Sequence, residues 1–363
     1  MHLESVVREF QVDGNVISIE PYGNGHINAT YQVILDRGGQ TVRYILQRIS
    51  SIVFPDTPAL MDNLVRVTDH IRNQLQQKGA SDITRRVLTV VATNDGTFHR
   101  DTEGADWRMF LFIENAHAYE TVPSGSVIYE AARAFGEFAS QLRNLPGPPL
   151  HTVLPDFHNG IKRFRDFQEA LDRDPENRAI QAKKEIRLVS QFTLILDIFP
   201  ALLKNGRLPV RIVHNDTKIN NVLLDDGTEK GLCVIDLDTV MEGLAAYDFG
   251  DLMRTVLSST AEDESDLEKI GLNLDHFTAL KNGYLAGAGH FLTQAERENL
   301  VNGGKLITLL MGIRFLTDFL NGDLYYHIHY PDHNLRRCRT QFQLLKLMLQ
   351  CEEEMQNQVM SES

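Results

Sequence analysis

In the first third of the chain, hydrophobic and polar residues alternate over short stretches, a period typical of β-strands. One longer segment in this part repeats its hydrophobic residues every three or four positions, which predicts an amphipathic helix. We expect strands at residues 16–20, 30–34, 41–49, 87–91 and 107–113, and the helix at residues 58–77.

The remaining two thirds have mainly the helical period, interrupted by short apolar runs at residues 211–213, 222–224 and 232–235 that predict strands. The turn-prone residues 225–228 join the last two runs into a hairpin. The pattern therefore predicts the α+β class, with a small, mostly β lobe (residues 1–115) and a large, mostly α lobe (residues 116–363). Helices are expected at residues 124–142, 157–171, 179–203 with a break at Pro200, 293–321, and from 334 to the C-terminal end.

Three polar residues at the ends of these short strands have the chemistry of phosphoryl transfer. Asp216 follows the first strand, Asn221 lies five positions later, and Asp236 ends the hairpin. The reaction needs a carboxylate to orient and deprotonate the attacking hydroxyl, and oxygen ligands to hold Mg²⁺ on nucleotide phosphates. Because the hairpin returns Asp236 to the edge where Asn221 lies, we expect these two to bind Mg²⁺ and Asp216 to be the base. The alternative is an ordinary hairpin with polar ends.

Composition narrows the classes of protein. At 363 residues, the chain is long enough for two lobes with a buried core, and its 42% hydrophobic and 23% charged residues are those of a globular protein. A net charge of -13 opposes binding to nucleic acid or anionic membranes. The three cysteines lack metal-ligand spacing and indicate reduced thiols. With neither a signal peptide nor an apolar run near ~18 residues, a cytoplasmic protein is expected. The oligomeric state stays open.

At these motifs the chain resembles the aminoglycoside phosphotransferase and choline kinase superfamily of small-molecule kinases. Within it, the chain is most similar to the N-acetylhexosamine 1-kinases. The motif around Asp216 indicates the superfamily, whereas the flanking segments indicate a sugar acceptor. The resemblance rests on residues 20–28, 44–47, 54–56, 157–159, 163–164, 214–221, 235–239, 312–316 and 330–335.

The resemblance implies a protein-kinase-like fold in which the N-lobe binds ATP and the C-lobe holds the catalytic loop and the sugar. It implies ATP and Mg²⁺ as cofactors, and phosphorylation of the anomeric hydroxyl of N-acetylglucosamine or N-acetylgalactosamine to the α-1-phosphate. Lys218 resembles the lysine that neutralises the γ-phosphate in protein kinases, or it is a solvated loop lysine. Adenine would lie against backbone groups at the lobe boundary, near Glu114.

On the acceptor side, the resemblance implies that Arg314 and Tyr325 bind the sugar. The alternative for Arg314 is an ion pair with Asp318, four residues on in the same helix. His26 either reaches the sugar or a phosphate, or it is a surface histidine.

On the nucleotide side, the turn Gly23-Asn24-Gly25 either covers phosphates with its backbone amides or is an ordinary hairpin turn. One position departs from the superfamily: Gln47 stands where related kinases often carry a lysine or arginine for the α- and β-phosphates. Arg43, on the same strand face, is one candidate to replace that cation. Otherwise, nucleotide affinity rests on magnesium and backbone amides.

Two further aspartates have open roles. Asp238 is either an additional metal or water ligand or a turn residue. The triplet Asp248-Phe249-Gly250 has the sequence of a protein-kinase signature. We do not assign Asp248 the role of the aspartate in that signature, because Asp236 already fills it. We expect Asp248 and Asp251 to cap and brace the following helix.

Two other functions remain. One is a kinase of a different small alcohol, such as an aminoglycoside, choline or homoserine; the acidic residues 262–266 could serve such a cationic acceptor, whereas Arg314 would oppose it. The other is a nucleotide-binding pseudokinase, which the presence of Asp216, Asn221 and Asp236 argues against.

Overall fold

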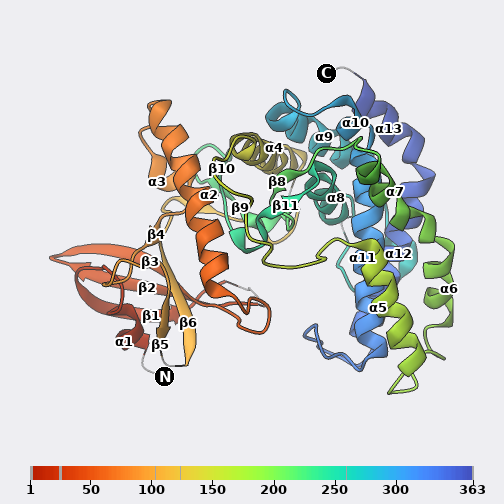
Figure 1. Ribbon diagram of the computed structural model, residues 1–363, viewed down its shortest axis with the longest axis horizontal. Helices are drawn as coiled ribbons and strands as arrows, with labels where there is room; N and C mark the ends of the chain where they lie inside the picture. The colour runs from red at the N-terminus through yellow and green to blue at the C-terminus, as the bar shows by residue number, and fades with distance from the viewer. Residues whose placement is uncertain (1–2, 24–26, 103, 123, 259, 362–363) are drawn as a thin grey trace.

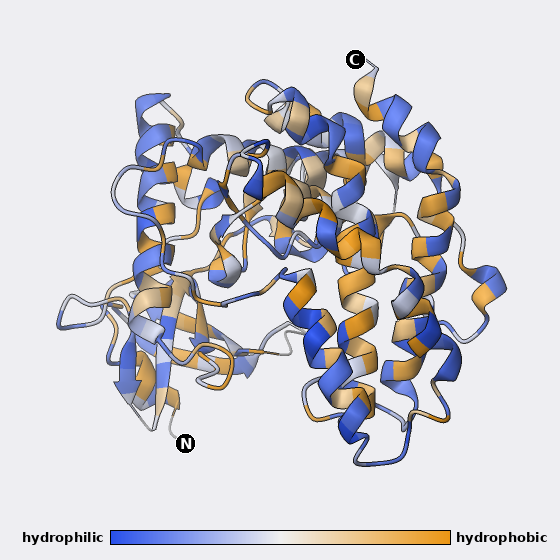
Figure 2. Ribbon diagram, turned by 45° about the vertical axis from the view of Figure 1, so that its right-hand side comes forward, coloured by the Kyte–Doolittle hydropathy of each residue, from blue (hydrophilic) through white to orange (hydrophobic). Residues whose placement is uncertain are grey.

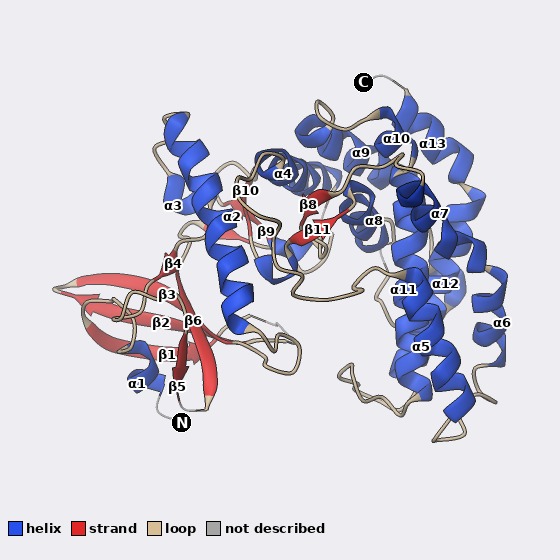
Figure 3. Cartoon of the chain, viewed as in Figure 1, coloured by secondary structure: helices blue, strands red, loops and turns tan. Residues whose placement is uncertain are grey.

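The structure is a computed structural model that describes residues 3–23, 27–102, 104–122, 124–258 and 260–361. An antiparallel sheet forms the N-terminal part and helices form the C-terminal part, with four short strands, β8 to β11, between them (Figure 1; Figure 3). The mostly β and then mostly α arrangement predicted from the hydrophobic pattern is confirmed.

The N-terminal sheet has the strand order β1-β2-β3-β6-β4, and β5 pairs with β6. Its buried face packs Leu35, Leu46, Trp107 and Met109 beneath the short helix α1 (Leu3–Val7), which the pattern did not predict. The expected strand at residues 87–91 shrinks to two residues because helix α3 (Ile83–Arg86) ends directly before it. The strands are β1 (Asn15–Pro21), β2 (Ala29–Arg37), β3 (Gln40–Arg48), β4 (Val90–Val91), β5 (Arg100–Thr102) and β6 (Ala105–Leu111).

Helix α2 (Thr57–Gln77) connects the two parts. The Asp56 side chain accepts a hydrogen bond from the Ala59 amide and so caps its start. Its apolar face, which includes Leu64 and Ile71, shares one hydrophobic core with helix α4 (Gly125–Leu142). The sheet is therefore attached to the helical part through packed side chains and not only through the chain that joins them.

The helical part is built around a long, largely hydrophobic central helix, α11 (Figure 2). The single helix expected at residues 179–203 is two helices, and the break lies at Phe192 instead of Pro200. The Thr193 hydroxyl bonds the Ser190 carbonyl at that break, whereas Pro200 stays inside a helix next to the fully buried Phe199. The helices are α5 (Gly160–Arg173), α6 (Lys183–Gln191), α7 (Thr193–Lys204), α8 (Ala245–Val256), α9 (Leu274–Ala288), α10 (Gln294–Glu298), α11 (Leu300–Leu320), α12 (His333–Gln350) and α13 (Glu352–Met360).

Two helical stretches, Lys183–Lys204 and Leu300–Leu320, are long and apolar enough to cross a membrane by length and composition. The sequence analysis considered only uninterrupted apolar runs, whereas these helices are apolar overall although polar residues are scattered along them. The second stretch is α11, and 78% of its most apolar part is buried inside the protein. Its hydrophobicity is therefore that of a core helix. The first stretch is interrupted at Phe192, between α6 and α7.

Helices α8 and α11 cross so closely that glycine is required at the contact. A Cβ atom added to Gly303 would lie 1.9 Å from the Ala246 carbonyl oxygen. We expect Gly303→Ala to lower the free energy of unfolding by about 1–3 kcal/mol, because the two helix backbones must move apart. Denaturant unfolding measures this, with Gly271→Ala as the control, since a Cβ there meets nothing within 4 Å. Equal losses in the two variants would contradict the prediction.

Candidate active site

The loop that carries Asp216 is held from below by helix α8. Strand β8 (Arg211–Val213) leads into it and pairs with β11 (Met241–Gly243). The buried Asp248 carboxylate accepts hydrogen bonds from the amides of His214 (2.9 Å) and Asn215 (2.7 Å). Asp248 lies in the first turn of α8, yet it braces the catalytic loop, so the expectation that it caps its own helix was wrong. The left-handed backbone of Asn215 (φ 67°) then turns the chain toward Asp216.

Side-chain hydrogen bonds also connect the same loop to α8 and to the segment that follows β10. The Thr217 hydroxyl donates to the Asp248 carbonyl at 2.5 Å, and the Thr239 hydroxyl donates to the His214 carbonyl at 2.6 Å. The His214 imidazole bonds the Ile235 carbonyl at 3.0 Å. His214 therefore supports the loop, and the position of Asp216 is set by buried bonds on both sides.

Asp216 lies between Lys218 and Asn221. The Lys218 Nζ is 2.8 Å from Asp216 Oδ1, and the Asn221 Nδ2 donates to the Asp216 backbone oxygen at 2.9 Å and to its Oδ2 at 3.2 Å. Burial disfavours the charged carboxylate, but the Lys218 ammonium and His214 outweigh burial, so the pKa of Asp216 lies below its usual value. Asp216 is thus an ionised carboxylate, able to orient a hydroxyl and accept its proton.

The hairpin predicted from the sequence is formed by β9 (Val222–Asp225) and β10 (Gly231–Val234). The Ile235 amide donates to the Asn221 carbonyl at 2.9 Å, which brings Asp236 to the start of β9. Burial, and then the neighbouring Asp238 and Asp216 carboxylates, raise the pKa of Asp236 to about 7. A buried carboxylate that is repelled by others is stabilised by a bound cation.

This donor set fits Mg²⁺. Because the Asn221 amide group donates to Asp216, its oxygen is the atom that remains suited to a cation. Mg²⁺ in kinases takes one or two carboxylate-type ligands and completes its shell with phosphate and water. Within the described residues no group of three or more His, Cys, Asp or Glu could hold a metal ion by itself. The site therefore fits a metal that arrives with a nucleotide.

Asp238 does not continue β10 beside Asp236. The left-handed backbone of Asp236 (φ 58°) ends the strand direction, and Leu237–Thr239 forms a 3-10 turn. Both Asp238 oxygens bond the Arg108 guanidinium, with Nη1 at 2.5 Å and Nη2 at 2.8 Å. The Asn28 side chain donates to the same carboxylate at 2.7 Å.

Gln47 and Arg43, the two third-strand residues discussed for the phosphates, have different positions. The Gln47 Oε1 accepts from Arg108 Nε at 2.9 Å, so Gln47 faces a buried cation supplied by the neighbouring strand. Arg43 forms a two-point ion pair with Glu114 and stands 4.1 Å from the centre of the Phe112 ring. Arg43 is therefore held beside Glu114 and Phe112, at the predicted lobe boundary.

The segment predicted as the lobe boundary is connected to the hairpin through Arg85. Its guanidinium donates to the carbonyls of Glu114 (3.0 Å) and Asn115 (2.8 Å) and pairs with Asp225 at 2.8 Å. The Glu114 carbonyl thus already has one donor. A nucleotide base in this region would meet a boundary segment whose position is fixed.

Of the residues predicted to form the phosphate loop, Gly23 lies within the described part of the chain. Gly23 has a left-handed backbone (φ 73°), which a turn at this point requires. Tyr22 packs edge-on against Phe112, with ring centres 5.8 Å apart. The other candidates, Asn24, Gly25 and His26, lie outside the described residues.

On the acceptor side, Arg314 lies among aromatic rings. Its guanidinium carbon is 5.5 Å from the ring centre of Phe157, 5.8 Å from Tyr325 and 5.6 Å from Tyr326. Among the contacts of the described residues, Asp318 bonds the backbone amides of residues 324–326 and the side chain of Asn334 instead of pairing with Arg314. Asp318 therefore holds the Tyr325–Tyr326 segment in place over Arg314.

His158 links this cluster to the catalytic loop. Its Nε2 bonds the Asn215 carbonyl at 3.1 Å, and its ring packs against Tyr247 at 5.0 Å. Burial lowers the pKa of His158 to about 4; the Asp251 charge opposes this decrease and the Arg314 charge adds to it, so the imidazole is neutral at pH 7. Several buried polar atoms in this region have no hydrogen-bond partner within the described part of the chain: Arg163 Nε, Asn220 Oδ1, Asp251 Oδ2 and the Tyr326 hydroxyl.

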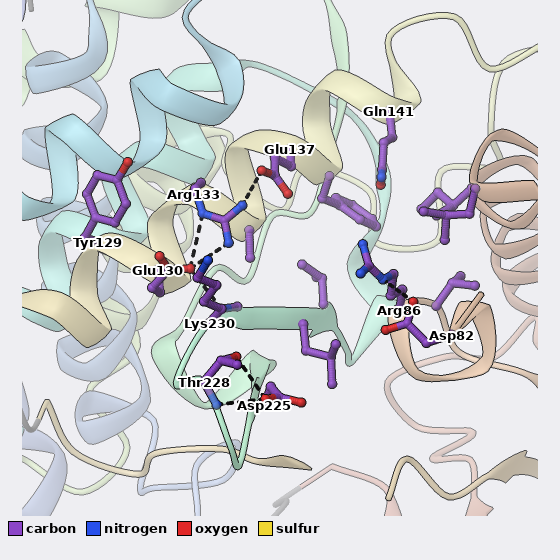
Figure 4. A pocket seen from close by; sticks show the side chains of 18 of the residues that line it. Asp82, Arg86, Tyr129, Glu130, Arg133, Glu137, Gln141, Asp225, Thr228 and Lys230 are labelled. Carbon is purple, nitrogen blue, oxygen red and sulfur yellow. Dashed lines mark hydrogen bonds and ion pairs between the residues drawn. The ribbon is translucent and has the colours of Figure 1, made fainter. Parts of the chain in front are cut away.

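A cavity of about 560 Å³ lies elsewhere, between α2, α4 and the β9–β10 hairpin (Figure 4). Five of its charged side chains pair with one another: Arg133 bonds Glu130 and Glu137, and Arg86 bonds Asp82 (Figure 4). None of the four predicted catalytic and metal-binding residues, Asp216, Lys218, Asn221 and Asp236, lines it. This cavity is therefore separate from the candidate active site.

Residues 18–281, well over half of the chain, match the model of the phosphotransferase enzyme family. The chain belongs to this family. Three solved structures share its fold over nearly their whole length. They are an aminoglycoside phosphotransferase from Alicyclobacillus acidocaldarius (TM-score 0.62, 13% identity, covering 98% of this chain and 96% of that one), a choline kinase from Cryptosporidium parvum (0.59, 14%, 99% and 97%), and a spectinomycin phosphotransferase in complex with ADP and spectinomycin (0.56, 11%, 96% and 97%).

The aminoglycoside phosphotransferase-type fold expected from the resemblance is thus confirmed, while the N-acetylhexosamine acceptor rests on sequence motifs alone. The structure brings Asp216, Lys218, Asn221 and Asp236 together, and it gathers Arg314 and Tyr325 in a second group. Sequence reasoning missed Arg108, although a charged residue within the apolar run 107–113 was a signal. It also missed the support that Asp248 gives the loop, for which no local pattern exists.

Proposed function

We propose that this family member is a kinase that transfers the γ-phosphoryl group of ATP to the anomeric hydroxyl of an N-acetylhexosamine. The acceptor would be N-acetylglucosamine or N-acetylgalactosamine, and the product its α-1-phosphate. The main support is the position of Asp216. It lies beside the Mg²⁺-type donors Asn221 and Asp236 and, through His158, next to the aromatic cluster around Arg314.

In this proposal Asp216 orients the sugar hydroxyl and accepts its proton as the new bond to phosphorus forms. Bound Mg²⁺ would neutralise developing charge on the phosphate oxygens. The Lys218 ammonium, whose pKa Asp216 raises, stays charged and is available to the transferred group. Gly23, with its left-handed backbone, would place its amide near the phosphates.

The acceptor side suits a neutral, polyhydroxylated molecule. The faces of Phe157 and Tyr325 can pack against the C–H surface of a sugar ring, and the Arg314 guanidinium can donate to an acetamido carbonyl. Buried atoms without partners, such as Arg163 Nε and the Tyr326 hydroxyl, need donors and acceptors that sugar hydroxyls supply.

A cationic acceptor has less support. Arg163 and Arg314 are close enough for the Arg314 charge to lower the pKa of Arg163, after the larger effect of burial. The acidic segment that could attract a cation is partly neutralised, because Glu262 pairs with Arg254 at 3.3 Å and with Arg337 at 3.5 Å. A pseudokinase is disfavoured by the intact contacts among Asp216, Lys218 and Asn221.

The test is ADP release with Mg²⁺-ATP across N-acetylglucosamine, N-acetylgalactosamine, glucose, galactose, kanamycin, choline and homoserine. We expect turnover confined to the N-acetyl sugars. Arg314→Met should then raise KM for the sugar more than about tenfold, as expected for loss of a charged hydrogen bond, and leave KM for ATP unchanged. Arg336→Met, which removes an exposed ion pair with Asp332, is the control. Turnover only with kanamycin or choline would overturn the sugar proposal.

A further inference from the structure

Arg108 is a charged residue in an environment that normally excludes charge. It lies on β6 within the N-terminal sheet and is 1% exposed. Its guanidinium makes a two-point ion pair with Asp238 across 130 residues of sequence, and its Nε bonds Gln47. Buried ion pairs of this kind often add no more stability than well-packed hydrophobic residues of similar volume. The pair therefore calls for a role beyond stability.

The partner of Arg108 lies in the same turn as the metal-type ligand Asp236. Only Leu237 separates the two aspartates, and residues 237–239 form a single 3-10 turn. Any displacement of Asp238 must therefore move Asp236 as well. The Arg108 charge also lies close enough to Asp236 to oppose the pKa increase that burial causes.

The turn has two anchors. On the C-terminal side, the Thr239 hydroxyl bonds the His214 carbonyl and the Thr239 carbonyl accepts from Asn215 at 2.9 Å. On the opposite side, the N-terminal sheet contributes Arg108 from β6 and Asn28, which precedes β2. The Asn28 oxygen in turn accepts from the Ser50 amide at 3.0 Å, so this second anchor is itself fixed within the sheet region.

The other cations considered for the phosphates do not connect the sheet to the metal-binding turn. Arg43 pairs with Glu114 at the lobe boundary, and Lys218 pairs with Asp216. Gln47 is uncharged and serves as the acceptor that orients Arg108. Arg108 is thus the cation through which the sheet contacts the metal-binding turn.

We propose that Arg108 is a positioning residue that, through its ion pair with Asp238, holds Asp236 in the geometry that binds the metal–nucleotide complex. This rests on the proposed use of Mg²⁺ and a nucleotide. It assigns Arg108 no contact with the phosphates. The metal-dependent part of nucleotide affinity should therefore depend on Arg108, and the metal-free part should not.

The experiment is calorimetric titration of ADP, with Mg²⁺ and with EDTA, into the wild type, Arg108→Met, and the double variant Arg108→Met/Asp238→Leu. The double variant removes both buried charges, so it guards against a single variant that fails to fold. Arg37→Met, which breaks an exposed ion pair with Asp13 at the edge of the same sheet, is the matched control. Thermal unfolding of each metal-free protein reports its stability separately.

We expect both Arg108 variants to bind Mg²⁺-ADP roughly tenfold to a hundredfold more weakly, the usual effect of losing a group that orients a metal ligand. Binding of ADP in EDTA and the behaviour of Arg37→Met should match the wild type. Equal weakening with and without Mg²⁺, or no weakening, would overturn the inference while the proposed function stands. A wild type that binds no Mg²⁺-ADP would overturn both.

Discussion

Asp216→Asn should nearly abolish phosphoryl transfer and leave nucleotide binding largely intact. The amide can still accept a hydrogen bond from Lys218, so the loop keeps its shape, but it cannot take a proton from the attacking hydroxyl. Loss of a general base usually reduces kcat by about 10²–10⁴-fold. Stopped assays of ADP release measure kcat, and titration with Mg²⁺-ADP measures nucleotide affinity.

The control for this variant is Asp226→Asn on the same hairpin. Asp226 is exposed, lies at the turn that joins β9 and β10, and contacts His117. The substitution therefore removes a carboxylate charge from the hairpin and leaves the contacts of the Asp216 loop unchanged. We expect this control to keep wild-type kcat. Wild-type turnover by Asp216→Asn would mean that another group aligns and deprotonates the acceptor, and the assignment of the base would be wrong.

Asp248→Ala should cause the largest loss of stability outside the hydrophobic core and also reduce turnover. Removing the carboxylate leaves the buried His214 and Asn215 amides without their acceptor, and each such group costs about 1–3 kcal/mol. Relaxation of the loop then moves Asp216. Denaturant unfolding and ADP release of the same preparation test the two effects, and a variant as stable as wild type would contradict the bracing role.

The pH dependence of this effect has a definite sign. Burial raises the pKa of Asp248 from 3.8 to about 6, so the native state binds more protons than the unfolded state between these values. The stability that Asp248 contributes is therefore complete below pH ~4 and declines as the pH rises through about 6. The advantage of wild type over Asp248→Ala should shrink over that interval. Asp248→Asn, which cannot titrate, is the control and should not share this trend.

The candidate catalytic residues could be predicted because they depend on local structure. Asp216, Asn221 and Asp236 lie within 21 residues, and a strand, a loop and one hairpin are enough to bring them together. The hydrophobic period likewise predicted α2 and α4, since each buries one continuous face against its neighbours. Failures at this level were local too, such as the helix break at Phe192, where side-chain bonding to the backbone outweighed a proline.

By itself, the sequence determined the family, the change from a mostly β to a mostly α part, and the candidate residues of the phosphotransfer loop, because these follow from hydrophobic period and short-range spacing. Tertiary structure alone decided that Arg108 faces Asp238, that Asp248 supports the loop, and that aromatic rings surround Arg314. The Asp248–Asn215 and Arg108–Asp238 contacts join residues that are 33 and 130 positions apart. A buried polar group loses its hydrogen bonds to water and needs a partner within the protein. No periodic pattern in the sequence shows which distant side chain will be that partner.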